Sequence, residues 1–464
     1  MPPIDHRGGD ELARKLGTWD TTLLTIGSVI GTGIFLTSSD IARVLPSAGG
    51  LLAVWLAGGL LTVAGALTYA ELGVLFPRAG GIYHYLKEAY GPLWGFLYGW
   101  GCFLVIMSGG IAALAVAFGE YLGVFVPFAS TSNVVLSAPV GPWVWSVSGA
   151  QLAAAAAILA LTAVNHFGVR EGATVQNLLT VLKVGSIVGI VAFGLTVKAP
   201  AHSLMTTAAA PASGLLAAFG VAMIAALWTY DGWYGPTFSA GEMRRPERNL
   251  PFGLIGGALI ITLLYVALNL VYLRAFPIAE MGSTQRIGEA AATVLFGARG
   301  GQLVALAILL STFGCLSATI LYSSRIYLPM ARDGLFFRSL GRVHPEHRTP
   351  TASLWTQSLW AVLLTLSGSY EQLYTFTVFA AVLFHIGTGA AIFVFRRTLP
   401  DHPRPYRVWG YPWVPAAFIL ASVLLVANTL FERPVESLLG VGLLALGLPA
   451  YATWRRRAAA ETSR

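Results

Sequence analysis

Residues 26–38, IGSVIGTGIFLTS, place three glycines within seven positions of an otherwise apolar stretch. Glycine is the poorest common helix former apart from proline, so its use where an unbroken helix could form needs a reason. Gly27 and Gly31 form a G-x-x-x-G pair, which is typical of close helix packing. Gly33 follows two residues later, which packing does not require, and no strand precedes the stretch as a nucleotide-binding loop would need. We therefore expect the helix to unwind here.

The composition indicates a membrane protein. Of the 464 residues, 56% are hydrophobic and 11% are charged, whereas soluble globular proteins contain about 25% charged residues. The two cysteines, Cys102 and Cys315, both lie in apolar segments, which indicates no disulfide framework. Residues 1–20 contain no apolar run, so we expect no cleavable secretory signal and a first span that itself directs insertion.

Twelve segments are long and apolar enough to cross a bilayer, which takes about 20 residues. They lie near residues 22–45, 51–75, 92–119, 149–167, 174–197, 215–238, 251–273, 301–328, 352–367, 372–395, 412–430 and 435–454. With both termini in the cytoplasm, the predicted inner segments carry 22 lysines and arginines and the predicted outer segments carry six. This asymmetry follows the positive-inside rule. It accounts for most of the net charge of +8, so that charge implies no nucleic-acid partner.

A second interruption falls half a chain after the first. The sixth predicted span contains Asp231, Gly232, Gly235 and Pro236. Two interrupted helices, each opening a set of five spans, indicate an inverted-repeat transporter with a site near the bilayer midplane. The expected organisation is a cytoplasmic segment (1–20), a first repeat (21–197), a second repeat (215–396), two further helices (412–454) and a cytoplasmic tail (455–464).

Unwound backbone inside a membrane is tolerated where it lines a cavity, and its free groups can then bind a ligand. Free N–H groups suit an anion, and free carbonyl groups suit a cation. A ligand with both charges close together is a zwitterion, of which an amino acid is the obvious example. A channel would instead show polar pore-lining repeats, and no G-x-S-x-G motif or other catalytic constellation indicates an enzyme.

Lys183 lies inside the fifth predicted span. A lysine there costs about 3 kcal/mol on insertion scales, so it needs a partner or a water-lined cavity. The alternative is a lysine that extends from the helix end to the membrane surface.

Several motifs together resemble the amino acid–polyamine–organocation transporters, and within them the L-type amino acid transporter branch. The resemblance covers about residues 20–454. It is carried by GSVIGTGIF (27–35), LTYAELGVLFPRAGGIYHYLKEAYG (67–91), TYDGWYGPTFSAGEMRRPERNLP (229–251), SSRIYLPMARDG (323–334) and PDHPRPYRVWGYP (400–412). It implies an all-α membrane protein with the LeuT-type fold, in which helices 1 and 6 are broken.

The resemblance also implies how a substrate amino acid binds. The carboxylate would meet the backbone N–H groups of Gly31, Thr32 and Gly33. The α-amino group would meet carbonyl groups of the two breaks, near Val29 and at Trp228 and Asp231, and Gly232 is a further expected substrate-binding residue. Trp228 stands where the family has an aromatic gate, commonly phenylalanine; the alternative is an ordinary core aromatic. The side-chain subsite would include Ile106, Gly110, Ala381 and His385.

Lys183 matches a lysine of sodium-independent family members, whose ammonium would occupy the place where sodium-coupled relatives hold their ion. Cys315 and Thr319 of the eighth span would face the same place, and a cysteine is a poor sodium ligand. Asp231 could recognise a cationic side chain, couple to protons or gating, or cap a half-helix. Glu71 and Glu242 match family motifs near the cytoplasmic ends and are expected to be structural or gate residues.

The sequence therefore predicts a sodium-independent exchanger or facilitator of L-amino acids, with neutral substrates, in the cell membrane. The alternative is a proton-coupled amino acid or polyamine transporter, with Asp231 or Glu71 carrying the proton. We expect no cofactor and no metal, since His344 and His347 lack a second ligand pair. We also expect no disulfide-linked ancillary subunit, because the outer loop 121–148 has no cysteine and the chain has no N-x-[ST] sequon. The exact amino acids and the oligomeric state stay open.

Overall fold

The computed structural model of the chain describes residues 16–78, 80–140, 143–167, 172–198, 214–344 and 349–462. This part is helical apart from one hairpin. In chain order the elements are α1 (Thr18–Val29), η1 (Gly33–Phe35), α2 (Thr37–Val44), α3 (Ala48–Leu75), α4 (Ile82–Tyr90), α5 (Pro92–Gly101), η2 (Cys102–Ile106), α6 (Met107–Leu122), η3 (Pro127–Ala129), β1 (Val134–Val140), β2 (Trp143–Ser148), α7 (Gly149–His166), α8 (Gly172–Thr196), α9 (Leu215–Tyr230), η4 (Gly235–Glu242), α10 (Pro246–Ala275), α11 (Ile278–Met281), α12 (Ile287–Arg332), η5 (Arg338–Gly341), α13 (Thr351–Thr365), α14 (Tyr370–Thr398), α15 (Trp413–Glu432), α16 (Pro434–Ala445) and α17 (Gly447–Thr462).

Nine helical segments in the described residues are long and apolar enough to cross a membrane. The other predicted spans coincide with the interrupted pair α1 and α2, with the 15-residue α13, and with α8, whose described apolar part is Thr180–Thr196. Twelve spans, the five-plus-five repeat and the side of each terminus stay predictions.

The break in the first span is present where the glycines predict it. Helix α1 ends at Val29, residues 30–32 are not helical, and the short turn η1 leads into α2. Because the chain leaves the helix here, the backbone groups of this stretch lose their helical partners.

The sixth span is interrupted as well. Helix α9 ends at Tyr230, Gly232 takes a φ of +93°, and the chain continues as the 3-10 turn η4. Only glycine adopts that φ readily. A Cβ at Gly232 would also lie 2.7 Å from the carbonyl oxygen of Ser28 in α1. The two breaks therefore lie against each other.

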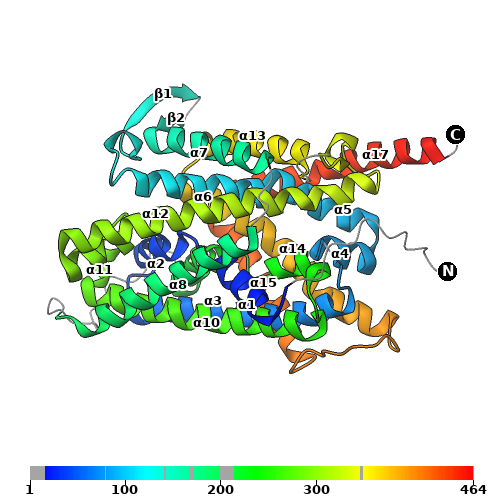
Figure 1. Cartoon of the computed structure of the whole chain (residues 1–464), viewed down its shortest axis with the longest axis horizontal. Helices are drawn as coiled ribbons and strands as arrows, with labels where there is room; N and C mark the ends of the chain where they lie inside the picture. The colour runs from blue at the N-terminus through cyan, green and yellow to red at the C-terminus, as the bar shows by residue number, and fades with distance from the viewer. Residues whose placement is uncertain are drawn as a thin grey trace.

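The helices pack in two groups around these breaks. Helix α10 packs along both α1 and α3, and α2 packs on α9. Helices α6, α7, α12 and α13 pack on one another along the opposite side (Figure 1). The β1–β2 hairpin and α11 lie at one end of the molecule, and α4 and α17 lie at the other (Figure 1).

The hairpin is the one departure from the expected all-α fold in the described chain. Strands β1 and β2 pair antiparallel within the loop 121–148. The indole N–H of Trp145 donates to the carbonyl of Leu366 over 2.8 Å, which ties the hairpin to the connection between α13 and α14. Valines and tryptophans on both sides of Gly141-Pro142 are a hairpin signal that an analysis of apolar length overlooks.

At the predicted cytoplasmic end, a buried carboxylate joins α3 to α14 and to the segment that follows α14. Glu71 of α3 is 2% exposed, and it accepts two hydrogen bonds from Arg396 of α14, at 3.0 and 2.7 Å. It also accepts the backbone N–H of Val408 at 2.7 Å and pairs with Arg404 at 3.5 Å. Burial and the charge of Glu71 raise the pKa of the nearby Tyr406 to about 12.

Candidate functional site

A small cavity of about 50 Å³ lies where the two helix breaks meet. Ten residues that the sequence singled out line it, namely Val29, Gly31, Gly33, Ile106, Gly110, Trp228, Asp231, Gly232, Cys315 and Thr319. Five more complete the lining: Ser28, Met107, Leu114, Thr229 and Tyr322. One water needs about 10–15 Å³ of such volume. The cavity therefore holds only a few water-sized groups, and a larger ligand requires some lining side chains to move.

The first break presents free hydrogen-bond donors. Among the described residues, no acceptor pairs with the backbone N–H groups of Gly31, Thr32 and Gly33. The hydroxyl of Thr32 is buried without a regular hydrogen bond and lies near that of Tyr370. A buried donor without an acceptor costs free energy, so this cluster favours a bound anion such as a carboxylate.

The carbonyl groups of the same break are, in contrast, mostly paired by side chains of other helices. Val29 accepts from the hydroxyl of Tyr265 (3.3 Å), Ile30 from the ammonium of Lys183 (3.4 Å), Ile34 from Tyr272 (3.3 Å) and Phe35 from Tyr121 (2.9 Å). Tyr265 also lies 3.2 Å from the carbonyl oxygen of Thr229, so one hydroxyl joins both broken helices. The unwound backbone is thus stabilised without a bound ion.

Lys183 is the charged member of this set. Its side chain comes from α8 and is 5% exposed. No carboxylate in the described part of the chain pairs with its ammonium, which lies close enough to Cys315 to interact electrostatically. The structure thus places Lys183 against the first break and not at a helix end.

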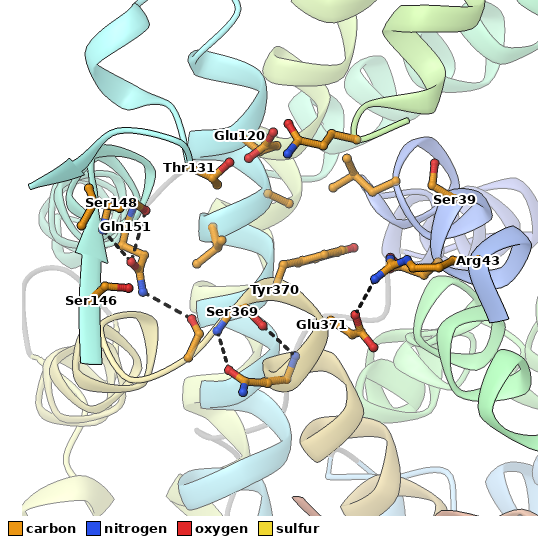
Figure 2. A pocket seen from close by; sticks show the side chains of 18 of the residues that line it. Ser39, Arg43, Glu120, Thr131, Ser146, Ser148, Gln151, Ser369, Tyr370 and Glu371 are labelled. Atoms are coloured by element: carbon orange, nitrogen blue, oxygen red, sulfur yellow. Dashed lines mark hydrogen bonds and ion pairs between the residues drawn. The ribbon is translucent and has the colours of Figure 1, made fainter. Parts of the chain in front are cut away.

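Trp228 and Tyr370 separate this cavity from a larger one. The indole N–H of Trp228 donates to the hydroxyl of Tyr370 over 2.8 Å. The indole also stacks on Tyr374, with an interplanar angle of 17°. Trp228 lines the small cavity, whereas Tyr370 lines a cavity of about 930 Å³ near the hairpin. Figure 2 shows that larger cavity, called the vestibule below.

Two residues of the predicted side-chain subsite lie elsewhere. Ala381 and His385 line a separate cavity of about 30 Å³, which shares Asp231 with the first. The ring nitrogen Nδ1 of His385 lies 2.6 Å from the hydroxyl of Tyr69. Asp231 interacts with the backbone N–H of Gly232 and the side chain of Tyr234.

The other residues that the sequence singled out do not line the small cavity in the described part of the chain. Glu71 lies near the end of α3 and does not line the cavity, and Glu242 ends η4. His347 lies outside the described residues, and the described part of the chain has no cluster of three metal-ligating side chains.

Sequence reasoning missed Tyr265, whose hydroxyl joins the two breaks, and Tyr370, which pairs with Trp228 between the two cavities. Tyr265 lies in an apolar run and Tyr370 lies in the polar stretch SGSYEQ (367–372), and nothing in either local sequence distinguishes the tyrosine from an interfacial or core aromatic. Their roles depend on which carbonyl or indole their hydroxyl reaches, and that follows from tertiary packing.

Comparison with known proteins identifies the family of the chain. The family model described as amino acid permease matches residues 16–444. The chain is 32% identical to the serine/threonine exchanger SteT of Bacillus subtilis (strain 168), over 98% of this chain and all of that protein. It is 30% identical to the human b(0,+)-type amino acid transporter 1, over 95% of this chain and 88% of the relative. It is 29% identical to the human large neutral amino acids transporter small subunit 2, over 96% and 81%. The chain therefore belongs to the amino acid permease family of the APC superfamily, whose members are multi-pass membrane transporters.

Proposed function

We propose that this protein exchanges small neutral L-amino acids across the cell membrane without sodium. The observation that carries the proposal is the row of unpaired N–H groups at Gly31, Thr32 and Gly33, next to a closed cavity. These donors suit the carboxylate that all amino acids share. Carbonyl groups of the neighbouring break, at Trp228 and Asp231, would accept the α-amino group.

Sodium independence is supported by Lys183. Its ammonium lies 3.4 Å from the carbonyl oxygen of Ile30, where an unwound helix would otherwise offer an oxygen to a diffusing cation. A tethered ammonium satisfies that carbonyl permanently. Cys315, in the same region, adds no oxygen ligand of the kind sodium prefers.

A small neutral side chain is supported by the lining. Ile106, Met107, Leu114 and the ring of Trp228 are apolar, and the free volume is small. A Cβ at Gly110 would lie 3.9 Å from the Trp228 ring, so the indole covers this glycine and limits the space. The relative SteT, a serine/threonine exchanger by its name, supports both exchange and small substrates.

Uptake into liposomes that contain the purified protein tests the proposal. We expect uptake of labelled L-serine or L-alanine to require an internal amino acid and to be equal in sodium and choline buffers. Uptake that rises steeply with external sodium, or that needs no internal amino acid, contradicts the sodium-independent exchange.

A proton-coupled or cation-selective transporter is the second candidate, because Asp231 faces two cavities. Replacing Asp231 with asparagine separates the two readings. If the carboxylate recognises a positive side chain, Asp231→Asn lowers lysine and arginine uptake selectively. For an exchanger of neutral substrates we expect equal loss for all substrates, or none. A pH gradient that drives net L-alanine uptake would support proton coupling.

A further inference from the structure

Five segments line the vestibule, each with at least one polar side chain, and the Trp228–Tyr370 pair lies between it and the small cavity. The walls come from α2, α6, the hairpin with the start of α7, residues 282–285, and residues 367–372 at the start of α14. Figure 2 shows Arg43 and Glu371 facing each other across one side, with Tyr370 nearby. A passage that only admitted substrate would need to be wide enough, and no particular charges would be required. The vestibule, in contrast, also brings opposite charges together.

The charges of the lining suit a zwitterion. The lining includes the carboxylates of Asp40, Glu120 and Glu371 and the guanidinium of Arg43. Arg43 bonds to Asp40 and, at 3.3 Å, to Glu371, yet half of its side chain (52%) is exposed. A guanidinium has five N–H donors, so Arg43 keeps donors for a further anion. An ammonium next to that anion finds Glu371 within reach.

Ser39 provides a second, independent sign of a ligand. The residue is 4% exposed, and its hydroxyl has no hydrogen-bond partner in the described chain. It lines the vestibule one helical turn before Arg43, so both side chains lie on one face of α2. A buried hydroxyl without a partner is unfavourable unless a ligand or water completes it.

We propose that the vestibule is an outer subsite that binds the transported amino acid as a zwitterion before the Trp228–Tyr370 pair opens. The carboxylate binds the guanidinium of Arg43 and the hydroxyl of Ser39, and the ammonium binds Glu371. The identity of the ligand rests on the proposed function, while the charge arrangement does not. The subsite raises the local substrate concentration directly above the closed cavity.

Equilibrium binding of tritiated L-serine to the purified full-length protein in nanodiscs tests the subsite. In wild type we expect two molecules bound per chain. Gly33→Val should disrupt the inner site, because a Cβ at Gly33 already lies 2.6 Å from the Thr229 hydroxyl and the collision displaces the N–H groups of the first break. This variant should still bind one L-serine. Adding Arg43→Gln or Ser39→Ala to it should weaken that binding about tenfold, the effect of losing a hydrogen bond to a charged group.

The chain offers a matched control for each change. Arg433 also pairs with Glu371, at 2.6 Å, but does not line the vestibule. Ser38 is fully buried with an equally unpaired hydroxyl, and it too is outside the lining. Arg433→Gln and Ser38→Ala should leave L-serine binding unchanged. If they weaken it as much as Arg43→Gln and Ser39→Ala do, the effect is structural and the subsite is wrong.

A labelling experiment keeps the proposal testable if Gly33→Val does not fold. Ser39→Cys, with both native cysteines replaced by serine, is treated from outside with a charged methanethiosulfonate. We expect L-serine to slow this reaction several-fold. Equal protection by acetate alone, or no protection, overturns the zwitterion subsite. Exchange that persists in either case leaves the proposed function standing, whereas protection without any amino acid transport refutes only that function.

Discussion

Gly33 shows why a particular residue type is required at the first break. A Cβ there would lie 2.6 Å from the hydroxyl oxygen of Thr229 and 3.0 Å from its Cα, so any side chain collides with the second broken helix. We expect Gly33→Val to abolish transport of all amino acids alike, because the collision displaces the N–H groups that hold the shared carboxylate. Gly256→Ala, at a position where a Cβ meets open space, is the control and should transport normally. Wild-type transport rates in Gly33→Val would disprove the carboxylate assignment.

Lys183 carries the second residue-scale prediction. Removing its ammonium leaves the carbonyl of Ile30 without a partner in a buried position, at a cost of a few kcal/mol. We expect the contact between the first break and α8 to change during alternating access, so that cost should fall unequally on the outward-facing and inward-facing states. We expect Lys183→Ala to lower exchange turnover about tenfold or more.

The control for Lys183 is Lys198→Ala, since Lys198 is an exposed lysine just after the same helix. It should exchange L-serine like wild type. A Lys183→Ala variant with normal turnover would mean that the lysine only extends to the membrane surface.

At the residue scale, the free backbone groups could be predicted from the sequence, whereas most of the side chains that pair with them could not. The positions of free N–H groups follow directly from glycines in an apolar run, and the structure has the break at those glycines. The partners of the free carbonyl groups could not be inferred, apart from Lys183, because a charge in an apolar segment is conspicuous and a tyrosine is not. In the sequence, Tyr265 is one more aromatic residue in an apolar segment. Only in the folded chain does its hydroxyl contact both breaks.

At the scale of elements, the lid is formed by α9 and α14 together. Trp228 comes from the last turn of α9, and Tyr370 is the first residue of α14, where Ser369 caps the helix. A single hydrogen bond of 2.8 Å joins the two side chains. Neither helix alone separates the small cavity from the vestibule, so the lid depends on how the two elements approach each other.

Removing that hydrogen bond should open the lid more often. We expect Tyr370→Phe to speed the modification of Cys315, which lines the small cavity, by an external cationic methanethiosulfonate. An increase of about fivefold corresponds to the net value of one hydrogen bond, about 1 kcal/mol. The measurement uses a Cys102→Ser background, in which Cys315 is the single remaining thiol.

Two comparisons make the lid experiment specific. Tyr90→Phe also removes one tyrosine hydrogen bond, to the carbonyl of Gly387, and should leave the modification rate of Cys315 unchanged. In a Trp228→Phe background, which lacks the donor, Tyr370→Phe should have no further effect. An additive increase in the modification rate of that double variant would show that this hydrogen bond does not keep the lid closed.

At the scale of the whole molecule, composition and charge asymmetry predicted a multi-pass membrane protein, and the family match confirms it. The two helix breaks were also predictable, because glycine and proline leave a local signal. The β1–β2 hairpin was missed, since an analysis of apolar length treats every polar connection as a loop. The vestibule could not be predicted, because its walls come from five separated segments that meet only in the folded chain.

The same limit applies to the predicted cytoplasmic end, where Glu71 joins α3, α14 and the connection that follows α14. Its carboxylate is 2% exposed and binds Arg396, Arg404 and a backbone N–H. Removing one partner of a buried ion pair costs about 3–5 kcal/mol, because the remaining charge stays buried. Arg404, whose side chain is 6% exposed, would be that charge.

We therefore expect Glu71→Gln to destabilise the whole fold by about 3–5 kcal/mol while leaving the binding site chemically intact. Thermal unfolding of the purified protein, followed by circular dichroism, should show a midpoint several degrees below that of wild type. Protein that remains folded should bind L-serine with unchanged affinity, since Glu71 does not line the cavity. The control is Arg397→Ala, which removes an exposed charge next to Arg396 and should not shift the midpoint. If Glu71→Gln unfolds like wild type but exchanges more slowly, Glu71 acts as a gate or a proton carrier, and its structural role is secondary.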